Sequence, residues 1–243
     1  MILLLDIGNT RIKWGCRERG EWRGQGALAI DRIEGLVAVI AEFSPVWAGV
    51  CCVAGEAARA GVEGLLAGLP SHWLRAAGAG HGIVNHYHPP ESLGADRYAG
   101  LIACRRRGHA PCVVASAGTA LTVDALAGDG EFLGGMILPG AALMRRVLAE
   151  GTAAVPALTG AWQAFPRSTG DAVATGILTA LAGTVEAMRT RLVDKLDREV
   201  PVVLTGGDAE GLAGYLPGPV TIENNLVLEG LLWLARDLGV SDA

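Results

Sequence analysis

The chain has 243 residues, of which 51% are hydrophobic and 19% charged, and its formal net charge is −5 at pH 7. This composition excludes an intrinsically disordered chain and is sufficient for one large domain or two small ones. The acidic balance argues against a general binder of nucleic acids or of anionic membranes. We therefore expect a folded protein with no nucleic-acid partner and no membrane partner.

The N-terminus and the cysteines both favour a cytoplasmic location. Residues 1–5 are apolar but carry no basic segment, and Asp6 ends the run, which predicts a strand rather than a signal peptide. No uncharged apolar stretch reaches the roughly 18 residues that a membrane span needs. The five cysteines form no C-x-x-C motif, and an odd number does not indicate a disulfide framework. We expect buried thiols in a reducing compartment.

In the first half of the chain, strand and helix patterns alternate. The predicted strands cover residues 1–5, 10–15, 46–53 and 72–74. The predicted helices cover residues 31–43, 56–69 and 96–107.

The second half repeats this alternation. Its predicted strands cover residues 112–115, 120–125, 132–137 and 200–204. Its predicted helices cover residues 141–150 and 170–196, a short segment from Asp208, and residues 225–238. Such an order predicts an α/β fold with mixed sheets and helices on both faces.

The two halves begin with similar segments. Residues 2–13 read I-L-L-L-D-I-G-N-T-R-I-K, and residues 112–123 read C-V-V-A-S-A-G-T-A-L-T-V. In each, an apolar strand enters a small-residue turn and returns as a second strand. The similarity indicates duplicated domains at 1–110 and 111–243, with chance similarity as the alternative.

The first candidate site is Asp6-Ile7-Gly8-Asn9-Thr10, between two predicted strands. Gly8 permits a tight turn, after which backbone N–H groups and the Thr10 hydroxyl can face an anion. Asp6 can hold a divalent cation that neutralises phosphate charge. The structural alternative is an ordinary hairpin turn, because all of these residue types favour turns.

Two further glycine turns are candidate nucleotide contacts. Gly118 and Thr119 occupy in the second half the position of the first turn, and the alternative there is a plain hairpin. Gly206 and Gly207 lie between a strand and a helix start, an arrangement that suits the phosphate or adenosine of a nucleotide. A simple loop is the alternative for this second pair.

The segment Leu93-Gly94-Ala95-Asp96-Arg97 opens a predicted helix. An Asp in a first helical turn most often caps the helix. Beside an Arg, however, the same carboxylate suits a general base next to an anion-binding cation.

Two common nucleotide motifs are absent from the sequence. There is no G-x-x-x-x-G-K-[ST], and the run Gly78–Gly82 is not followed by a predicted helix, as a dinucleotide-binding loop requires. His86 and His88 have a metal-like spacing, but no Cys lies nearby, and we interpret them as loop residues.

The order of these motifs resembles that of the type III pantothenate kinases of bacteria. The series is D-I-G-N-T, L-G-A-D-R, A-G-T-A-L-T-V-D, then G-G-M-I-L-P-G, Ser168-Thr169 and T-G-G-D-A, and it covers nearly the whole chain, from Asp6 to residues 225–230. Each motif alone is weak, but six in this order are specific. The resemblance implies two ribonuclease-H-like domains of the actin, acetate kinase and sugar kinase superfamily, with ATP between them, in a homodimer.

The resemblance also implies a role for each matching residue. Asp96 matches the base that takes the proton from the pantothenate hydroxyl. The residues expected to contact pantothenate are Tyr87, Gly94, Ala95, Arg97 and Thr169. Those expected to bind ATP, with Mg²⁺ near Asp6, are Asp6, Gly8, Asn9, Thr10, Lys13, Gly118, Thr119, Gly206 and Gly207.

One position departs from the family pattern. The family usually has D-x-G-T at the second phosphate loop, where the Asp binds an activating monovalent cation, but this chain has Ser116-Ala117-Gly118-Thr119. A neutral hydroxyl lacks the charge that favours K⁺ or NH₄⁺. We therefore expect little dependence on either ion, and Asp124, on the returning strand, need not replace the missing carboxylate.

The expected reaction converts ATP and pantothenate to ADP and 4′-phosphopantothenate, the first step of coenzyme A biosynthesis. One alternative is a kinase of the same superfamily that acts on another small alcohol. The other is a non-catalytic regulator that retains the fold. The joint presence of Asp6, Asp96 and Arg97 favours an enzyme, because a binding module does not need such a base.

Overall fold

The computed structural model describes residues 1–151 and 159–241. The chain forms two compact units, Met1–Gly108 with Asn225–Ala243, and His109–Asn224. The predicted division at residue 110 placed the last helix, α7 (Leu226–Asp237), in the second domain. In the structure this helix belongs to the first unit. It packs on α3 (Ala95–Arg106) so closely that a side chain at Gly230 would meet the backbone carbonyl of Ala99.

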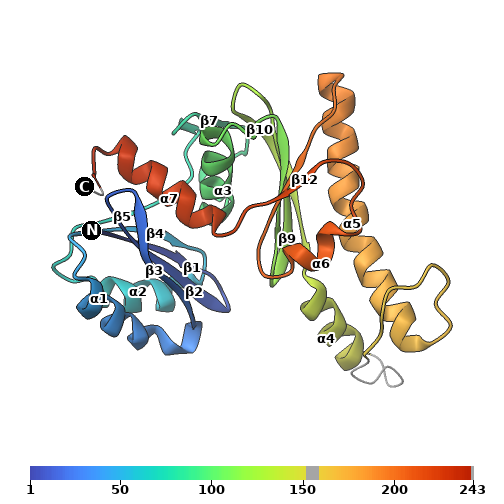
Figure 1. Ribbon diagram of the computed structural model, residues 1–243, viewed down its shortest axis with the longest axis horizontal. Coiled ribbons are helices and arrows are strands. Elements are labelled where there is room, and N and C mark those ends of the chain that lie inside the picture. Colours follow the sequence, from blue (N-terminus) through green and yellow to red (C-terminus); the bar gives the residue numbers. More distant parts are fainter. Residues whose placement is uncertain (152–158, 242–243) are drawn as a thin grey trace. The chain divides into compact units, whose positions relative to one another are not determined.

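The first unit contains a five-stranded mixed sheet of order β3-β2-β1-β4-β5 (Figure 1). Its strands are β1 (Ile2–Ile7), β2 (Arg11–Glu18), β3 (Glu21–Ala29), β4 (Trp47–Cys52) and β5 (Ser71–Trp73). The central strand β1 is antiparallel to β2 and parallel to β4. Its apolar residues are fully buried, which agrees with a strand covered on both faces.

Helices cover both faces of this sheet (Figure 1). On one face lie η1 (Ile30–Gly35), α1 (Leu36–Phe43) and α2 (Gly55–Leu65), and their apolar side chains pack on Leu3, Leu5 and Ile7. On the other face α3 packs against β4, and α7 packs against β1 and β4. Before α3 the chain forms a small antiparallel hairpin, β6 (Ala79–Gly80) and β7 (Ile83–Asn85), and a 3₁₀ turn, η2 (Pro90–Ser92).

The second unit is built on strands in the order β12-β11-β8-β9-β10. They are β8 (Cys112–Ala117), β9 (Ala120–Leu126), β10 (Glu131–Pro139), β11 (Val202–Thr205) and β12 (Val220–Ile222). The long helix α5 (Thr169–Leu196) packs on this sheet through Ile177, Leu181 and Val185, and α4 (Ala141–Gly151) packs on α5. The short α6 (Ala209–Ala213) completes the core with Leu212.

The two units share one strand topology, which confirms the predicted duplication of the fold. In each, the first strand pairs antiparallel with the second and parallel with the fourth, and the fifth continues in parallel. The orders β3-β2-β1-β4-β5 and β10-β9-β8-β11-β12 are therefore equivalent. The predicted mixed α/β fold with helices flanking both sheets is confirmed.

Most of the predicted elements are confirmed, and the differences have local causes. The helix expected at 31–43 consists of η1 followed by α1, and within η1 it is interrupted at Arg32, which has the non-helical angles φ −116° and ψ 35°. Three further elements were not predicted from the sequence, namely β3, β12 and the β6–β7 hairpin. In β3 the signal is weakened by Gly24 and Gly26, and the rings of Phe43 and Trp14 occupy the space that side chains there would fill.

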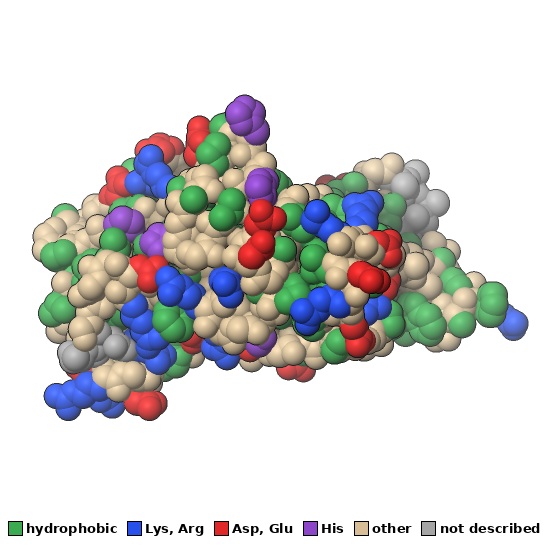
Figure 2. Space-filling model, turned by 90° about the horizontal axis from the view of Figure 1, so that it is seen from above, with side chains coloured by type: hydrophobic (Ala, Val, Ile, Leu, Met, Phe, Trp, Pro, Cys, Tyr) green, Lys and Arg blue, Asp and Glu red, His purple; other side chains and the backbone are tan. Residues whose placement is uncertain are grey.

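Two surface features bear on the expected partners. No helix among the described residues is long and apolar enough to cross a bilayer. Figure 2 shows basic and acidic side chains intermixed in small groups over one face. This mixture agrees with the small net charge of −5.

Candidate active site

In the first unit, Asp6 lies at the end of β1, where its neighbours in the sheet are Lys13 on β2 and Cys51 on β4. Burial first, and the Asp96 carboxylate second, raise the pKa of Asp6 to about 7, while Lys13 acts in the opposite direction. Burial and the carboxylates of Asp6 and Asp96 also raise the pKa of the Cys51 thiol well above its usual range. Two carboxylates that are distant in sequence therefore share one electrostatic environment.

Asp96 lies in the first turn of α3, but it is not the residue that caps the helix. The N-cap is Gly94, which makes no side-chain capping bond. The Oδ1 atom of Asp96 accepts a hydrogen bond from the N–H of Arg97, at 2.8 Å. A Cβ atom at Gly94 would lie 2.6 Å from this same Oδ1. The absence of a side chain at Gly94 therefore leaves room for the Asp96 carboxylate in this position.

The turn after Asp6 is a tight hairpin. This geometry agrees both with an ordinary hairpin turn and with an anion-binding turn. The N–H of Gly8 donates to the carbonyl of Arg11 at 3.0 Å, which closes the turn. Asn9 and Thr10, at its tip, are exposed. Their polar groups are accessible to a ligand.

Tyr87 and Arg97 contact each other in the first unit. The guanidinium Nη2 of Arg97 donates to the Tyr87 hydroxyl at 3.0 Å. Arg97 is 7% exposed, and Tyr87 is half-buried. A buried cation beside a phenol hydroxyl can hold a carboxylate or another polar acceptor.

In the second unit, three segments meet backbone to backbone at the turn between β8 and β9. The N–H of Gly140 donates to the carbonyl of Thr119 at 2.9 Å, and the N–H of Asp208 donates to the carbonyl of Ala117 at 3.1 Å. A Cβ atom at Gly140 or at Gly206 would collide with the backbone of this turn. Gly206 also has a φ of +100°, so glycine is required there for two reasons.

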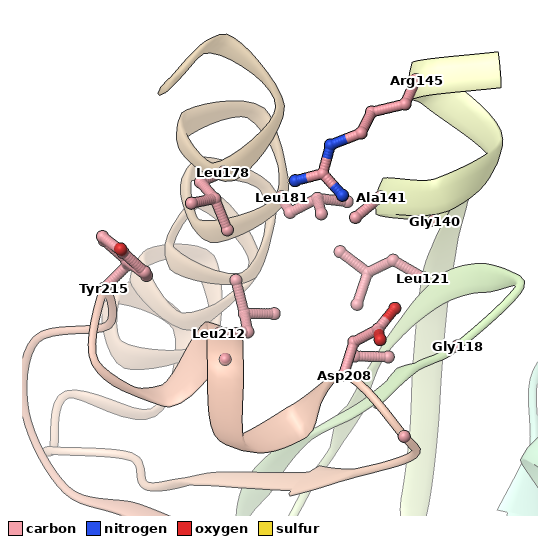
Figure 3. Close-up of a pocket in the computed structure, with 13 residues that line it drawn as sticks. Gly118, Leu121, Gly140, Ala141, Arg145, Leu178, Leu181, Asp208, Leu212 and Tyr215 are labelled. Atoms are coloured by element: carbon pink, nitrogen blue, oxygen red, sulfur yellow. The ribbon is translucent and has the colours of Figure 1, made fainter. Parts of the chain in front are cut away.

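A cavity of about 330 Å³ opens beside this turn (Figure 3). Its apolar wall contains Leu121, Leu178, Leu181 and Leu212. Gly118, Gly140 and Gly207 bring backbone to its edge, and Arg145 and Asp208 supply charged groups. Figure 3 shows the Arg145 guanidinium reaching from α4 toward the cavity and the Asp208 carboxylate at the opposite margin. This combination suits a ligand with an apolar ring system and polar substituents.

Ser116 lies in a row of hydroxyl side chains on the sheet of the second unit. It is paired with Thr122 on β9 and with Thr205 on β11. Residues paired in register point to the same face of a sheet, so the row contains three neutral oxygens and no carboxylate. Asp124 is buried further along β9, opposite Val114.

Thr169 is the first residue of α5 and is exposed. The preceding residue, Ser168, caps the helix by accepting from the N–H of Asp171 at 3.1 Å. The Asp171 carboxylate in turn accepts from the N–H of Ala161 at 3.0 Å, which ties the preceding loop to the helix end. The hydrogen bonds of the Asp171 carboxylate with the N–H of Ala161 and with the Ser168 side chain lower the pKa of Asp171.

The residues that can hold a divalent cation are few. Within residues 1–151 and 159–241, no group of three or more His, Cys, Asp or Glu side chains is arranged to bind a metal. Asp6 nevertheless fits Mg²⁺, because the Asp96 carboxylate raises the pKa of Asp6 and a bound cation would relieve this repulsion. Mg²⁺ commonly takes one or two protein carboxylates together with substrate phosphates.

Comparison with known proteins identifies the family. The family model for type III pantothenate kinase matches residues 2–191. The chain belongs to the type III pantothenate kinase family. It is 44% identical over 239 residues to the type III pantothenate kinase of Thiobacillus denitrificans, with 96% of both chains covered.

Solved structures show the same fold. The chain is similar to a protein from Campylobacter jejuni described as a "conserved putative Baf family transcriptional activator", with a TM-score of 0.65, 24% identity and 98% of each chain covered. It is also similar to the acetate kinase of Porphyromonas gingivalis, with a TM-score of 0.52, 10% identity and 99% coverage of that chain. The expected actin and acetate kinase type of fold is thereby confirmed, and the protein is a kinase with ATP as the family's phosphoryl donor.

The structure brings several of the predicted site residues of this kinase together within each unit. Asp6 and Asp96 share one environment, and Arg97 contacts Tyr87, in the first unit. In the second, Gly206 approaches the backbone of Ala117, which directly precedes Gly118 and Thr119, and both Gly118 and Gly207 line the cavity. Arg145 and Tyr215, which also line the cavity, were not predicted from the sequence, because neither is part of a motif.

Proposed function

We propose that this chain transfers the γ-phosphate of ATP to the primary hydroxyl of pantothenate, which gives 4′-phosphopantothenate, the first step of coenzyme A biosynthesis. The single observation that supports this most strongly is the pair of carboxylates, Asp6 and Asp96, beside the buried Arg97. It supplies a base and a cation site at one place. Membership of the family supports the choice of substrate.

Asp96 is the proposed base. Its carboxylate accepts the hydroxyl proton of pantothenate as that oxygen attacks the γ-phosphorus, and ADP leaves with the bonding electrons. Phosphoryl transfer depends chiefly on position and charge. The hydrogen bond from the N–H of Arg97 orients the Asp96 carboxylate, and the small Gly94 leaves room for it.

Arg97, Tyr87 and Thr169 are the proposed pantothenate contacts, with the backbone of Gly94 and Ala95. The guanidinium of Arg97 is buried, so a substrate carboxylate or hydroxyl oxygen bound to it experiences little competition from water. Tyr87 already accepts a hydrogen bond from Arg97 and fixes the direction of the remaining donors.

The proposed nucleotide contacts are the glycine turns, considered within each unit separately. In the first unit, the Gly8–Thr10 turn and Lys13 bind phosphate oxygens. In the second, Gly118, Thr119, Gly206 and Gly207 bind the nucleotide, and the cavity of about 330 Å³ accepts the adenosine. The apolar leucine wall suits a purine ring, and the bare glycine backbone allows phosphate or ribose to approach.

Mg²⁺ is the proposed metal, held by Asp6 together with ATP phosphates. When bound, it neutralises the negative charge that develops on the phosphate oxygens. No K⁺ or NH₄⁺ is proposed, because the hydroxyls of Ser116, Thr122 and Thr205 supply no negative charge.

A cytoplasmic homodimer is the proposed form of the enzyme, on the basis of the family resemblance. Size-exclusion chromatography with light scattering tests the dimer, and a mass of one chain contradicts it.

The substrate is tested by coupled measurement of ADP release with ATP and Mg²⁺. Pantothenate, pantoate, glycerol and ethanolamine are compared at equal concentrations. We expect turnover with pantothenate alone, and mass spectrometry of the product should show one added phosphate. Faster turnover with another alcohol favours a different small-alcohol kinase, and no turnover with any alcohol favours the non-catalytic alternative.

A further inference from the structure

Asn85, the last residue of β7, is one of the few buried polar side chains of the first unit. It is 7% exposed, and its own N–H donates to the carbonyl of Gly78 at 2.8 Å, within the hairpin. Neither the motifs nor the family resemblance gave it a role. A polar side chain is buried at a cost unless its hydrogen bonds are made, so its partners indicate what it does.

Both ends of the Asn85 amide bond to the backbone of the loop that follows. The Nδ2 atom donates to the carbonyl of Pro90 at 2.8 Å. The Oδ1 atom accepts from the N–H of Tyr87 at 3.0 Å. One rigid amide therefore joins the start of this loop, at Tyr87, to its end, at Pro90.

The two ends of this loop lead to the two halves of the proposed pantothenate site. Tyr87 presents its hydroxyl to Arg97 at 3.0 Å. Pro90 begins η2, which leads directly into Gly94 and the first turn of α3. The Asn85 amide thus fixes the Tyr87 backbone relative to the segment that carries Asp96 and Arg97.

We propose that Asn85 is a positioning residue for pantothenate, which acts by holding Tyr87 against Arg97. This inference rests on the proposed function, since Tyr87 and Arg97 are substrate contacts only in that account. A loop that is ordered before the substrate binds loses less conformational entropy on binding. Removal of the amide should therefore weaken pantothenate binding and leave ATP binding unchanged.

The test compares Asn85→Ala, which loses both bonds, with Asn85→Asp, which keeps the acceptor for Tyr87 but cannot donate to Pro90. Each variant is assayed at a temperature at which circular dichroism shows that it is folded. If Asn85→Ala is unstable, Asn85→Asp provides the test. We expect the KM for pantothenate to rise about 10-fold or more in Asn85→Ala and less in Asn85→Asp. The KM for ATP should change less than about 2-fold.

Ser92→Ala is the matched control. Its hydroxyl donates to the carbonyl of Pro89 at 2.6 Å, so the variant removes a similar bond from the same loop without touching Tyr87. We expect both KM values to stay within about 2-fold of wild type. A similar rise in the KM for pantothenate in Ser92→Ala would assign the effect to general loosening of the loop and overturn the proposal.

A double-mutant cycle with Tyr87→Phe separates positioning from stability. If Asn85 acts through Tyr87, Asn85→Ala should raise the KM for pantothenate much less in the Tyr87→Phe background than in wild type. Equal factors in both backgrounds, or an equal rise in both KM values, overturn the inference. Wild-type protein that does not phosphorylate pantothenate overturns the proposed function itself, whereas an active wild type with unchanged Asn85 variants overturns this inference alone.

Discussion

Asp6, at the end of β1, and Asp96, in the first turn of α3, share one environment, in which burial first and the Asp96 carboxylate second raise the pKa of Asp6 to about 7. Ninety residues of sequence separate the two, and the parallel pairing of β1 with β4 and the packing of α3 on β4 connect their elements. The pair carries an energetic cost in the free protein at neutral pH. The cost is consistent with a site prepared for a cation and a proton transfer.

The first prediction concerns stability and pH. The pKa of Asp6 in the folded state, about 7, exceeds the ordinary value of 3.8. Between these values the folded state retains a proton that the unfolded state has released, so this group lowers the free energy of unfolding as pH rises through the window. Asp6→Asn removes the charge, and we expect it to be more stable than wild type at pH 8 by about 1–3 kcal/mol, with a smaller difference at pH 5. Urea unfolding at both values measures this.

The matched control for this prediction is Asp129→Asn, in an exposed turn where the carboxylate accepts from the N–H of Glu131. Its effect should be similar at both pH values. A destabilised Asp6→Asn at pH 8 would show that the Asp6 charge is favourable in the free protein, contrary to the account.

The second prediction uses Gly94. Its φ of −56° suits any residue, but a Cβ atom there would lie 2.6 Å from the Asp96 Oδ1. In Gly94→Ala the carboxylate must move, and we expect kcat to fall about 10–100-fold with little change in melting temperature. Gly64→Ala, where a Cβ meets nothing within 4 Å, should leave kcat unchanged. Unchanged kcat in Gly94→Ala would show that the position of Asp96 is not critical.

The third prediction concerns ATP. Binding to the folded state raises the melting temperature, so the thermal shift with ATP and Mg²⁺ reports nucleotide affinity. Thr10→Val and Thr119→Val remove a hydroxyl from the turn of each unit, and we expect each to reduce the shift. If neither changes it, the assignment of both turns to ATP is wrong.

The fourth prediction concerns monovalent cations. Because Ser116, Thr122 and Thr205 form a neutral row, activity in Tris buffer should be close to activity with added KCl at matched ionic strength. Ser116→Asp adds a carboxylate and should create K⁺ dependence, or impair activity when K⁺ is absent. A wild-type enzyme that is inactive without K⁺ and restored by it contradicts the prediction.

The sequence was sufficient to predict elements with strong periodicity, such as β1, β8 and α5. It was not sufficient for β3, where Gly24 and Gly26 lower the strand signal and rings from Phe43 and Trp14 compensate only in the folded state. The prediction of one continuous helix at 31–43 was wrong in part, because the non-helical backbone angles of Arg32 cannot be recognised from the pattern of apolar residues. Association of α7 with the first unit is likewise a tertiary effect, through its close contact at Gly230 and Ala99.

For the site, the motifs predicted which residues take part, but not how those residues lie and act on one another in the fold. Asp6 and Asp96 were expected to act in one reaction, but their mutual effect on pKa depends on packing. The alternative in which Asp96 is the N-cap of the helix is wrong, because Gly94 holds that position. Arg145 and Asn85 carry no motif, and only their location shows that one faces the cavity and the other joins two parts of a loop.

The central claim is that Asp96 is the base of a pantothenate kinase, and turnover of Asp96→Asn with pantothenate and ATP tests it most directly. The amide keeps the shape but cannot accept a proton, and we expect kcat to fall ~10²–10⁴-fold with an unchanged circular dichroism spectrum. Glu91→Gln, which changes an exposed carboxylate of η2, is the control and should retain activity. Near-wild-type turnover in Asp96→Asn would contradict the account.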